Sequence, residues 1–316
     1  MSAQPVYNMT DGKPKVVCLL SNWLSGATLL TILLSGHSEV VSNGEAMYFD
    51  DRDKDRYDCT CGKYIEECEF YSAAAQHMRL TDGKGWDPRL FVHAPRFSDN
   101  AILRHFLGSW RYESALRDRF MNLIGSYRST RDRFLDAQLQ FFENARRLSG
   151  ASIYLDGTKS IRRAQLLARS GRCDMKVLHM IRDGRGFCLS FQKACVADNQ
   201  RVTLGDCAKA WVRYIGWVDA FSRSFPSIPV LTVRYEDLCR STAETIRAIS
   251  RFMEIPYEDL SRNGEMKDTH ILGNRFRRYF TGAIVEDTSW KTKFDQRTQA
   301  ALTSMMKTQL ERFGYV

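Results

Sequence analysis

Three short apolar runs, each followed by a helical pattern, constrain the fold of this chain more than any other feature. The runs are rich in Val, Ile and Leu and lie at residues 15–21, 175–181 and 230–235, with a weaker fourth at 152–155. Helical patterns follow at residues 26–34, 185–197 and 242–253. Continuous apolar runs of this length are typical of parallel strands that are buried on both faces. The alternation therefore predicts an α/β fold, a parallel sheet flanked by helices.

A single domain is expected to span residues 1–316. A chain of 316 residues can bury a large core without a metal or disulfide staple. Its 44% of hydrophobic residues exclude disorder, and no stretch rich in Pro, Gly and Ser separates two halves. The polar residues 1–14 are expected to form a flexible N-terminus. Residues 98–148, roughly, are Arg-rich and helical in pattern, which predicts a helical insertion in the first half.

The net charge of +9 favours a basic cleft that attracts an anionic ligand. Nucleic acid is disfavoured, because the nine arginines between Arg104 and Arg147 come without an aromatic stacking platform. The chain has no run of roughly 18 uncharged apolar residues, and its N-terminus lacks a signal-peptide core. We therefore expect a cytoplasmic protein that binds neither nucleic acid nor membrane.

Two segments that follow predicted strands are candidates for binding phosphate groups. After the first run come Ser25, Gly26 and Thr28, a small-residue turn that opens a helix and presents backbone N–H groups to an anion. The segment lacks G-x-x-x-x-G-K-[ST], which disfavours an ordinary ATP or GTP site and a kinase-like function. After the second run, Arg182 and Ser190 are spaced to grip a phosphate from two elements. A plain helix-capping turn and a strand-end salt bridge remain open as alternatives.

Several short motifs, taken in order along residues 15–295, resemble the sulfotransferases that use 3′-phosphoadenosine 5′-phosphosulfate (PAPS). They are S-G-A-T-L-L at 25–30, G-H-S-E-V-V-S-N-G-E at 36–45, D-G-T-K-S at 156–160, R-D-G-R-x-x-x-x-S at 182–190, R-Y-E-D-L at 234–238 and G-N-R-F-R at 273–277. Each motif is weak alone, but the ordered set is specific. The resemblance is to the branch that includes bacterial small-molecule and tyrosylprotein sulfotransferases. It implies a P-loop-like sheet and transfer without a metal.

The resemblance implies two catalytic residues. Glu45 would be the general base that accepts the proton of the acceptor hydroxyl, and Lys159 would stabilise the leaving phosphate and the sulfonate. A structural glutamate and an ordinary surface lysine remain open as the alternatives. The residues implied to bind PAPS or its product, 3′,5′-adenosine bisphosphate (PAP), are Leu24, Ser25, Gly26, Ala27, Thr28, Arg182, Ser190, Tyr235, Asn274, Arg275 and Arg277. Arg277, or else Arg275, would clamp the 3′-phosphate.

The implied reaction moves the sulfuryl group of PAPS to a hydroxyl of a soluble small molecule, with an amine as the less favoured acceptor. The partners are accordingly PAPS or PAP and a small-molecule acceptor, while the acceptor's identity and a homodimer are left open. Variable loops and helices, here residues 46–150, are expected to form the acceptor pocket.

One departure from the family pattern concerns the first loop. The family's loop usually reads P-[RK]-S-G-[ST]-[ST], whereas this chain has Trp23 and Leu24 in place of Pro-[RK], and Ala27 in place of a hydroxyl residue. Three explanations compete: another cation substitutes, the acceptor itself is cationic, or the protein binds PAP and PAPS but is catalytically impaired. We favour substitution by Lys159.

Five of the nine cysteines lie in apolar or helical patterns and are expected to be reduced, buried thiols: Cys18, Cys173, Cys188, Cys195 and Cys239. Cys61-Gly62-Lys63, with Cys68 and Phe70, resembles a C-x-C-G…C-x-F segment of bacterial members of the family. Cys59, Cys61, Cys68 and His77 also invite a zinc interpretation, but their spacing lacks the paired C-x₂-C knuckles of structural zinc sites. The sequence therefore predicts no metal.

Overall fold

A five-stranded parallel sheet lies at the centre of the protein. The computed structural model describes residues 12–45, 58–76, 78, 95, 121–260, 269–273 and 276–316. The strands are β1 (Lys15–Ser21), β2 (Val40–Ser42), β3 (Ile153–Asp156), β4 (Asp174–Ile181) and β5 (Val230–Arg234). Their order is β2-β3-β1-β4-β5, and every neighbouring pair is parallel. The predicted α/β fold is confirmed.

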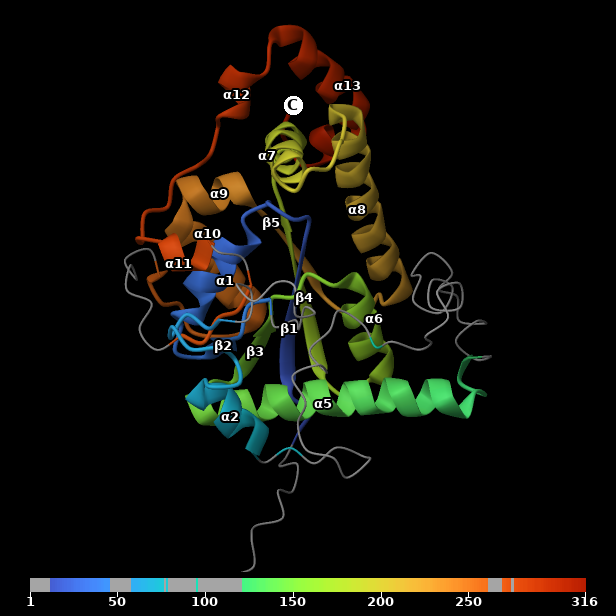
Figure 1. Cartoon of the computed structure of the whole chain (residues 1–316), viewed down its shortest axis with the longest axis vertical. Coiled ribbons are helices and arrows are strands. Elements are labelled where there is room, and N and C mark those ends of the chain that lie inside the picture. The colour runs from blue at the N-terminus through green and yellow to red at the C-terminus, as the bar shows by residue number, and fades with distance from the viewer. Residues whose placement is uncertain are drawn as a thin grey trace, which may run out of the picture.

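Helices flank the sheet on both sides (Figure 1). The described helices are α1 (Ala27–Ser35), α2 (Glu69–Gln76), α5 (Gly125–Ser149), α6 (Ile161–Ser170), α7 (Gly184–Ala197), α8 (Leu204–Ser224), α9 (Tyr235–Arg240), α10 (Thr242–Met253), α11 (Phe276–Tyr279), α12 (Trp290–Lys293) and α13 (Gln296–Arg312). In Figure 1, α1, α9 and α10 lie on one side of the sheet, α6 and α8 lie on the other, and α5 crosses one end.

Successive side chains of β1 pack into cores on opposite faces of the sheet, which explains why both faces are covered. Val16 and Leu20 belong to a core shared with α5 and α6, whereas Val17 and Leu19 belong to a second core shared with α1 and α10. Successive side chains of a strand point to opposite faces, so an apolar run without polar interruptions must be buried on both. A third core joins α7, α8 and α13, which packs the C-terminal helix against the helices that follow β4.

Apart from one-residue offsets at several element ends, the predicted elements differ from the observed ones in two respects. Tyr235 begins α9 and does not end the last strand. The three-residue strand β2 was not predicted as a strand, because Val40–Ser42 is too short for a recognisable apolar run. The first difference lies at the carboxyl end of β5, and the second is an outer strand of the sheet.

The strand order makes the carboxyl ends of β1 and β4 the expected position of a ligand crevice. From β1 the chain passes through α1 to β2 on one side of the sheet, and from β4 it passes through α7 and α8 to β5 on the other side. The register pairs Ser21 with Met180, so these two strands end together. In open parallel sheets, ligands bind at the point where neighbouring connections diverge in this way. The loops after β1 and β4 are therefore the first place to look for a site.

Two sequence predictions fall partly outside the described residues. The proposed helical insertion, 98–148, overlaps α5, a helix of 25 residues, while residues 98–120 lie outside the described part. The predicted N-terminal segment is described only from residue 12 onward. The description of the chain as one domain stays a proposal.

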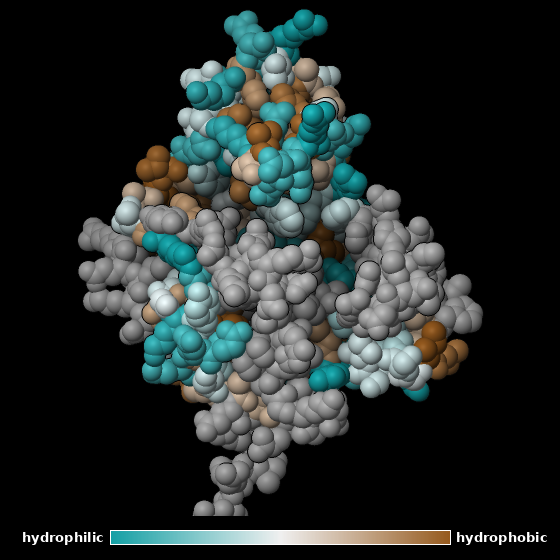
Figure 2. All heavy atoms as spheres, viewed as in Figure 1, coloured by the Kyte–Doolittle hydropathy of each residue, from teal (hydrophilic) through white to brown (hydrophobic). Residues whose placement is uncertain are grey.

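Figure 2 shows that the surface of the described residues on one face is mostly hydrophilic, with hydrophobic residues in small separate groups. Scattered apolar side chains are ordinary on a protein surface. Within the described residues, no helix combines the length and apolarity that crossing a bilayer requires.

Candidate active site

The loop after β1 presents backbone N–H groups at the crevice. Gly26 caps α1 in the left-handed conformation, with φ of 85°, and this cap makes no side-chain hydrogen bond. A Cβ atom at this position would overlap the ring of Tyr235, so the close packing requires glycine. The first N–H groups of a helix have no partner within it and attract anions. The geometry of this loop therefore suits an anionic ligand.

Leu24 lies in this loop where the resembled family carries a basic residue. Its φ of 60° is a left-handed conformation that is strained for a residue with a branched side chain. The carbonyl of Leu24 accepts a hydrogen bond from Nη1 of Arg182 at 3.2 Å. The loop thus gains its nearest described cation from the end of β4 and not from its own sequence.

Arg182 and Ser190 come together as the spacing predicts. Nη1 of Arg182 donates to Oγ of Ser190, on α7, at 3.2 Å. The guanidinium group also lies over the ring of Tyr235, with its Cζ atom 4.8 Å from the ring centroid. The Arg182 side chain is only 8% exposed. Because its position is fixed by three elements, the guanidinium is pre-organised beside the first loop.

Asp287 is a partner of Arg182 to which no sequence motif pointed. Nη2 of Arg182 donates to the Asp287 carboxylate at 2.8 Å and to its carbonyl at 2.9 Å. The Asp287 N–H in turn donates to the Tyr235 hydroxyl at 3.0 Å. Burial acts to raise the pKa of Asp287, but hydrogen bonds from Ser289 and Arg182 outweigh it and hold the pKa at about 2. A carboxylate therefore occupies part of the donor fork that an anionic ligand would use.

Lys159 lies in the turn between β3 and α6. Its φ of 61° is again left-handed. Its carbonyl accepts a hydrogen bond from the Tyr214 hydroxyl at 3.1 Å, and that hydroxyl accepts one from the Ser21 N–H at 2.9 Å. Tyr214, on α8, thus ties the end of β1 to the turn after β3. Burial lowers the pKa of Lys159 to about 7.

Glu45 follows β2 and is held by a distant segment of the chain. Its N–H donates to the carbonyl of Leu272 at 3.1 Å, and the Leu272 N–H donates to the carbonyl of Asn43 at 3.0 Å. Gly273, with φ of 108°, packs so closely that a Cβ atom there would overlap the Glu45 side chain. Residues 271–273 therefore act as a backbone clamp on the segment that carries Glu45.

The Glu45 carboxylate and the Lys159 ammonium group form an ion pair. The lysine side chain is 8% exposed and the glutamate side chain 23%, so the pair is largely removed from water. The carboxylate favours the charged form of Lys159 and so opposes the effect of burial on its pKa. The two implied catalytic residues thus meet at the edge of the sheet where β1 and β3 end. A cation and a carboxylate in contact there can serve transfer between an anionic donor and a hydroxyl acceptor.

Arg277 has a different environment from the one expected of a phosphate clamp. Its side chain is fully buried, Nε donates to the Ile271 carbonyl at 3.1 Å, and Nη2 donates to the Asp58 carboxylate at 2.8 Å. Further hydrogen bonds run to the carbonyls of Gly273 and Asp58. In this arrangement Arg277 joins the 271–273 segment to Asp58, and the predicted contact with a 3′-phosphate would require these bonds to be exchanged. Asn274, Arg275 and His77 lie outside the described residues.

The remaining loop residues take supporting positions. Ser25 is buried, and Ala27 and Thr28 begin α1 directly after the Gly26 cap. Tyr235 packs against Gly26 and Arg182, and its hydroxyl donates to the Val285 carbonyl at 3.2 Å. Sequence reasoning missed Tyr214 and Asp287, since a lone tyrosine within a helix and a lone aspartate in a polar loop carry no motif.

Comparison with known families agrees with the geometry of this edge. The family model described as "Sulfotransferase family" matches residues 17–259. That range includes the first loop, both residues of the ion pair, and the Arg182–Ser190 pair. No curated protein matches the chain in sequence at a significant level.

Solved structures with a similar fold carry the same family name. The sulfotransferase domain from the Synechococcus PCC 7002 olefin synthase has a TM-score of 0.52 and 15% identity, over 97% of each chain. The sulfotransferase domain from the curacin biosynthetic pathway has a TM-score of 0.47 and 15% identity, over 94% of this chain and 99% of that one. Mouse sulfotransferase SULT7A1 complexed with PAP has a TM-score of 0.45 and 10% identity, over 95% of this chain and 86% of that one. At these identities the likeness concerns the fold alone.

Proposed function

This chain belongs to the sulfotransferase family, and from that premise we propose that it transfers the sulfuryl group of PAPS to a hydroxyl of a small-molecule acceptor. An amine is the second choice of acceptor. The observation that carries the proposal is the buried ion pair of Lys159 and Glu45 at the carboxyl edge of the sheet. When bound, PAPS supplies an activated sulfuryl group whose leaving group is a phosphate.

The segments that follow β1 and β4 have the hydrogen-bond donors that a bisphosphorylated nucleotide requires. The uncapped first turn of α1 offers backbone N–H groups to one phosphate. Arg182 and Ser190 offer a charged fork and a hydroxyl to the other. An incoming phosphate would replace the Asp287 carboxylate on Arg182, which makes binding an exchange of one anion for another. The contacts of Asn274, Arg275 and Arg277 with the nucleotide remain part of the proposal.

Lys159 takes the place of the missing loop cation in this proposal. Charge develops on the leaving phosphate as the S–O bond breaks, and a cation that is fixed and shielded from water stabilises it strongly. Leu24 cannot supply that charge. The ammonium group of Lys159 is buried, and the Tyr214 hydroxyl holds the backbone carbonyl of its turn.

Glu45 is proposed to take the acceptor's proton. As the acceptor oxygen forms its bond to sulfur, its O–H bond breaks, and the proton passes to the Glu45 carboxylate. The electron pair of the breaking S–O bond goes to the phosphate, where Lys159 neutralises it. Proton, sulfuryl group and leaving charge are thus each assigned to a named atom or group.

The ion pair also suggests how the two residues are released for their roles. In the resting protein, Glu45 and Lys159 neutralise each other in a partly dry site. A bound anionic nucleotide competes with Glu45 for the ammonium group. Once Lys159 turns to the nucleotide, the carboxylate is available to the acceptor hydroxyl, so base and cofactor become active together.

Acceptor-dependent formation of PAP tests the proposed reaction. The full chain would be incubated with PAPS and a panel of small hydroxyl- and amine-bearing compounds, with PAP and sulfated product both quantified. We expect one PAP per sulfated product, with hydroxyl compounds the better acceptors. Binding of PAP without turnover on any acceptor would instead support the catalytically impaired alternative, and transfer that needs ATP and Mg²⁺ would refute the proposal.

A further inference from the structure

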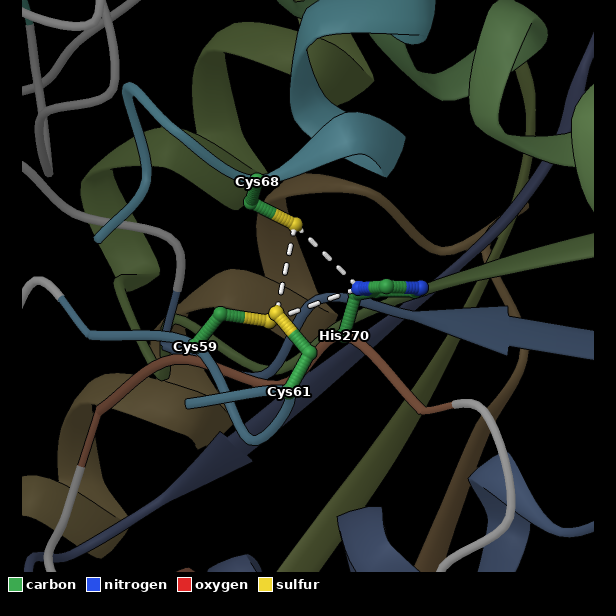
Figure 3. Close-up of side chains that lie close together, drawn as sticks. All are labelled: Cys59, Cys61, Cys68 and His270. Carbon is green, nitrogen blue, oxygen red and sulfur yellow. Dashed lines mark hydrogen bonds between the residues drawn. The ribbon is translucent and has the colours of Figure 1, made fainter. Parts of the chain in front are cut away.

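Three cysteines and one histidine converge at a point separate from the ion pair (Figure 3). The sulfur atoms of Cys59, Cys61 and Cys68 and a ring nitrogen of His270 all lie within 4.8 Å of one another. Nδ1 of His270 is 3.2 Å from the Cys68 sulfur and 3.4 Å from the Cys59 sulfur. The sulfurs of Cys61 and Cys68 are 3.7 Å apart. The histidine comes from a segment about 200 positions away in sequence from the cysteine loop.

We propose that these four side chains bind a structural zinc ion. A tetrahedral zinc ion has Zn–S bonds of about 2.3 Å and Zn–N bonds of about 2.0 Å, which places its ligand sulfurs about 3.8 Å apart and sulfur and nitrogen about 3.5 Å apart. Three of the distances between the side chains, 3.2, 3.4 and 3.7 Å, lie close to these edges, and all four ligand atoms lie within 4.8 Å of one another. Three thiolates and an imidazole select zinc over magnesium or calcium, which prefer oxygen ligands. Four protein ligands fill the coordination shell, so the ion would be structural.

The local backbone supports a thiolate site. The Cys59 N–H donates to the Lys63 carbonyl at 2.8 Å, and the Gly62 N–H donates to the Cys59 carbonyl at 2.9 Å, which folds the loop into a tight turn. Backbone groups of Cys61 and Lys63 hydrogen-bond to the sulfurs of Cys59 and Cys61, respectively. Hydrogen bonds of this kind favour the negative charge that metal-bound sulfur carries.

His270 is oriented as a ligand by its surroundings. Its ring stacks on Phe70, with centroids 4.7 Å apart and planes 11° apart. Its backbone carbonyl accepts hydrogen bonds from the Tyr71 hydroxyl and from Nδ2 of Asn43, both at 3.1 Å. The stack on Phe70 sets the plane of the ring, and the two hydrogen bonds hold the backbone from which the ring projects. The segment from Cys68 to Tyr71 therefore supplies one ligand, Cys68, and positions another, His270, through Phe70 and Tyr71.

A disulfide between Cys61 and Cys68 is the competing interpretation. It would account for two sulfurs in contact, but it would not account for the third thiol and the imidazole at the same point. Because the two cysteines are 7 positions apart, it would also stabilise the fold less than a disulfide that closes a long loop. A pocket lined in part by Asp58, Cys59 and Gly62 borders the cluster, and Arg277 and Arg278 line it as well.

The zinc site would also fix the segment that holds Glu45. Two residues after His270, the Leu272 carbonyl accepts the hydrogen bond from the Glu45 N–H. An ion that joins His270 to the cysteine loop would therefore hold the backbone clamp in place. This consequence rests on the proposed function, whereas the presence of the metal does not.

Metal content tests the site directly. The full chain would be purified under a phosphine reductant without chelator, and zinc would be measured by mass spectrometry. We expect about one zinc per chain, retained in Cys195→Ser, which changes a thiol outside the cluster, and lost in Cys61→Ser and His270→Ala. Wild-type protein that holds no zinc and takes up none from added Zn²⁺ would overturn the proposal, whatever its activity.

Two further readouts do not depend on the variants folding. Cys61 is an exposed thiol, so alkylation of native protein should spare it until a chelator is added. Replacement of zinc by Co²⁺ should give the absorption bands of a tetrahedral thiolate site. Rapid alkylation of Cys61 in untreated, zinc-supplemented protein, or octahedral cobalt spectra, would contradict the proposal. If zinc is present and its removal lowers sulfuryl transfer but not PAP binding, this result confirms that the ion holds residues 271–273 against the segment of Glu45.

Discussion

Lys159 and Glu45 are ion-paired although they lie 114 positions apart in sequence. Lysine comes from the turn after β3, and glutamate from the segment after β2, so two neighbouring strands deliver opposite charges to one edge of the sheet. The pair is largely buried, which makes each charge costly without the other. In the proposed mechanism the same pair supplies the cation for the leaving group and the base for the acceptor.

Removal of the Lys159 charge should reduce turnover more than nucleotide binding. We expect Lys159→Ala to lower kcat on the order of 10²–10³-fold, because a fixed charge at the leaving group acts mainly in the transition state. The measurement is steady-state transfer together with calorimetric titration of PAP. Lys176→Ala is the matched control, since Lys176 is a mostly buried lysine that pairs with Glu254, whose side chain lies on the protein's surface. Wild-type turnover in Lys159→Ala would contradict the assigned role.

Substitution of Glu45 should slow proton removal from the acceptor. Glu45→Gln keeps the shape of the side chain but loses its basicity, and we expect turnover to fall on the order of 10²–10⁴-fold. Affinity for PAP should stay the same or increase, because a negative charge beside Lys159 is removed. Glu254→Gln serves as the control on the surface pair. Unchanged turnover in Glu45→Gln would assign Glu45 a structural role.

The pH dependence of kcat/KM should report the buried lysine. Burial lowers the pKa of Lys159 to about 7 from its ordinary 10.5, so the charged form is lost as the pH rises above about 7. We expect kcat/KM to fall on that basic side, and Lys159→Arg to lessen the fall, because arginine stays charged. A wild-type kcat/KM that stays constant as the pH rises above about 7 would contradict this role of Lys159.

The contribution of Lys159 to the free energy of unfolding should increase with pH, whereas kcat/KM should decrease. Between pH 7 and about 10.5 the unfolded chain binds more protons at Lys159 than the folded one, so this group makes the protein more stable as the pH rises through that window. Lys159→Met removes the titration, so the unfolding free energy of the wild type minus that of the variant should increase from about pH 6 to about pH 9. Denaturant melts at both pH values measure this difference.

A substitution at Leu24 distinguishes an active enzyme from a catalytically impaired one. Because Lys159 supplies the cation in our account, Leu24→Arg should not increase turnover and should lower it modestly, since position 24 is half-buried with φ of 60°. A gain on the order of 10²-fold would show that the loop cation is the missing catalytic group, which supports the impaired alternative. Parallel PAP titrations distinguish a change in binding from a change in chemistry.

Much of the fold could be predicted because local patterns and tertiary structure agree. Runs 15–21 and 175–181 are apolar at most positions that the sheet buries, and Ser21 and His179 are the buried polar exceptions. Strand β2 could not be predicted in the same way, because three residues are too few to show a period. The pairing of Arg182 with Ser190 followed from the spacing of strand end and helix.

The rest of the site depends on contacts that no local pattern encodes. Tyr214 reaches Ser21 across 193 positions, and Asp287 reaches Arg182 across 105. The sequence also pointed to His77 as the companion of the three cysteines, whereas the structure brings His270 to them. Only the packing of the 269–273 segment beside β2 makes that neighbour visible.

Calorimetric titration with PAP, compared with 5′-AMP, tests the central claim most directly. The account predicts that PAP binds in the micromolar range and that 5′-AMP binds far more weakly, because it lacks the 3′-phosphate. Arg182→Lys and Ser190→Ala should each weaken PAP binding and reduce the difference in affinity between PAP and 5′-AMP. The lysine variant keeps the charge and loses only the forked geometry. No binding of PAP to the wild-type protein, or equal binding of PAP and 5′-AMP, would contradict the account.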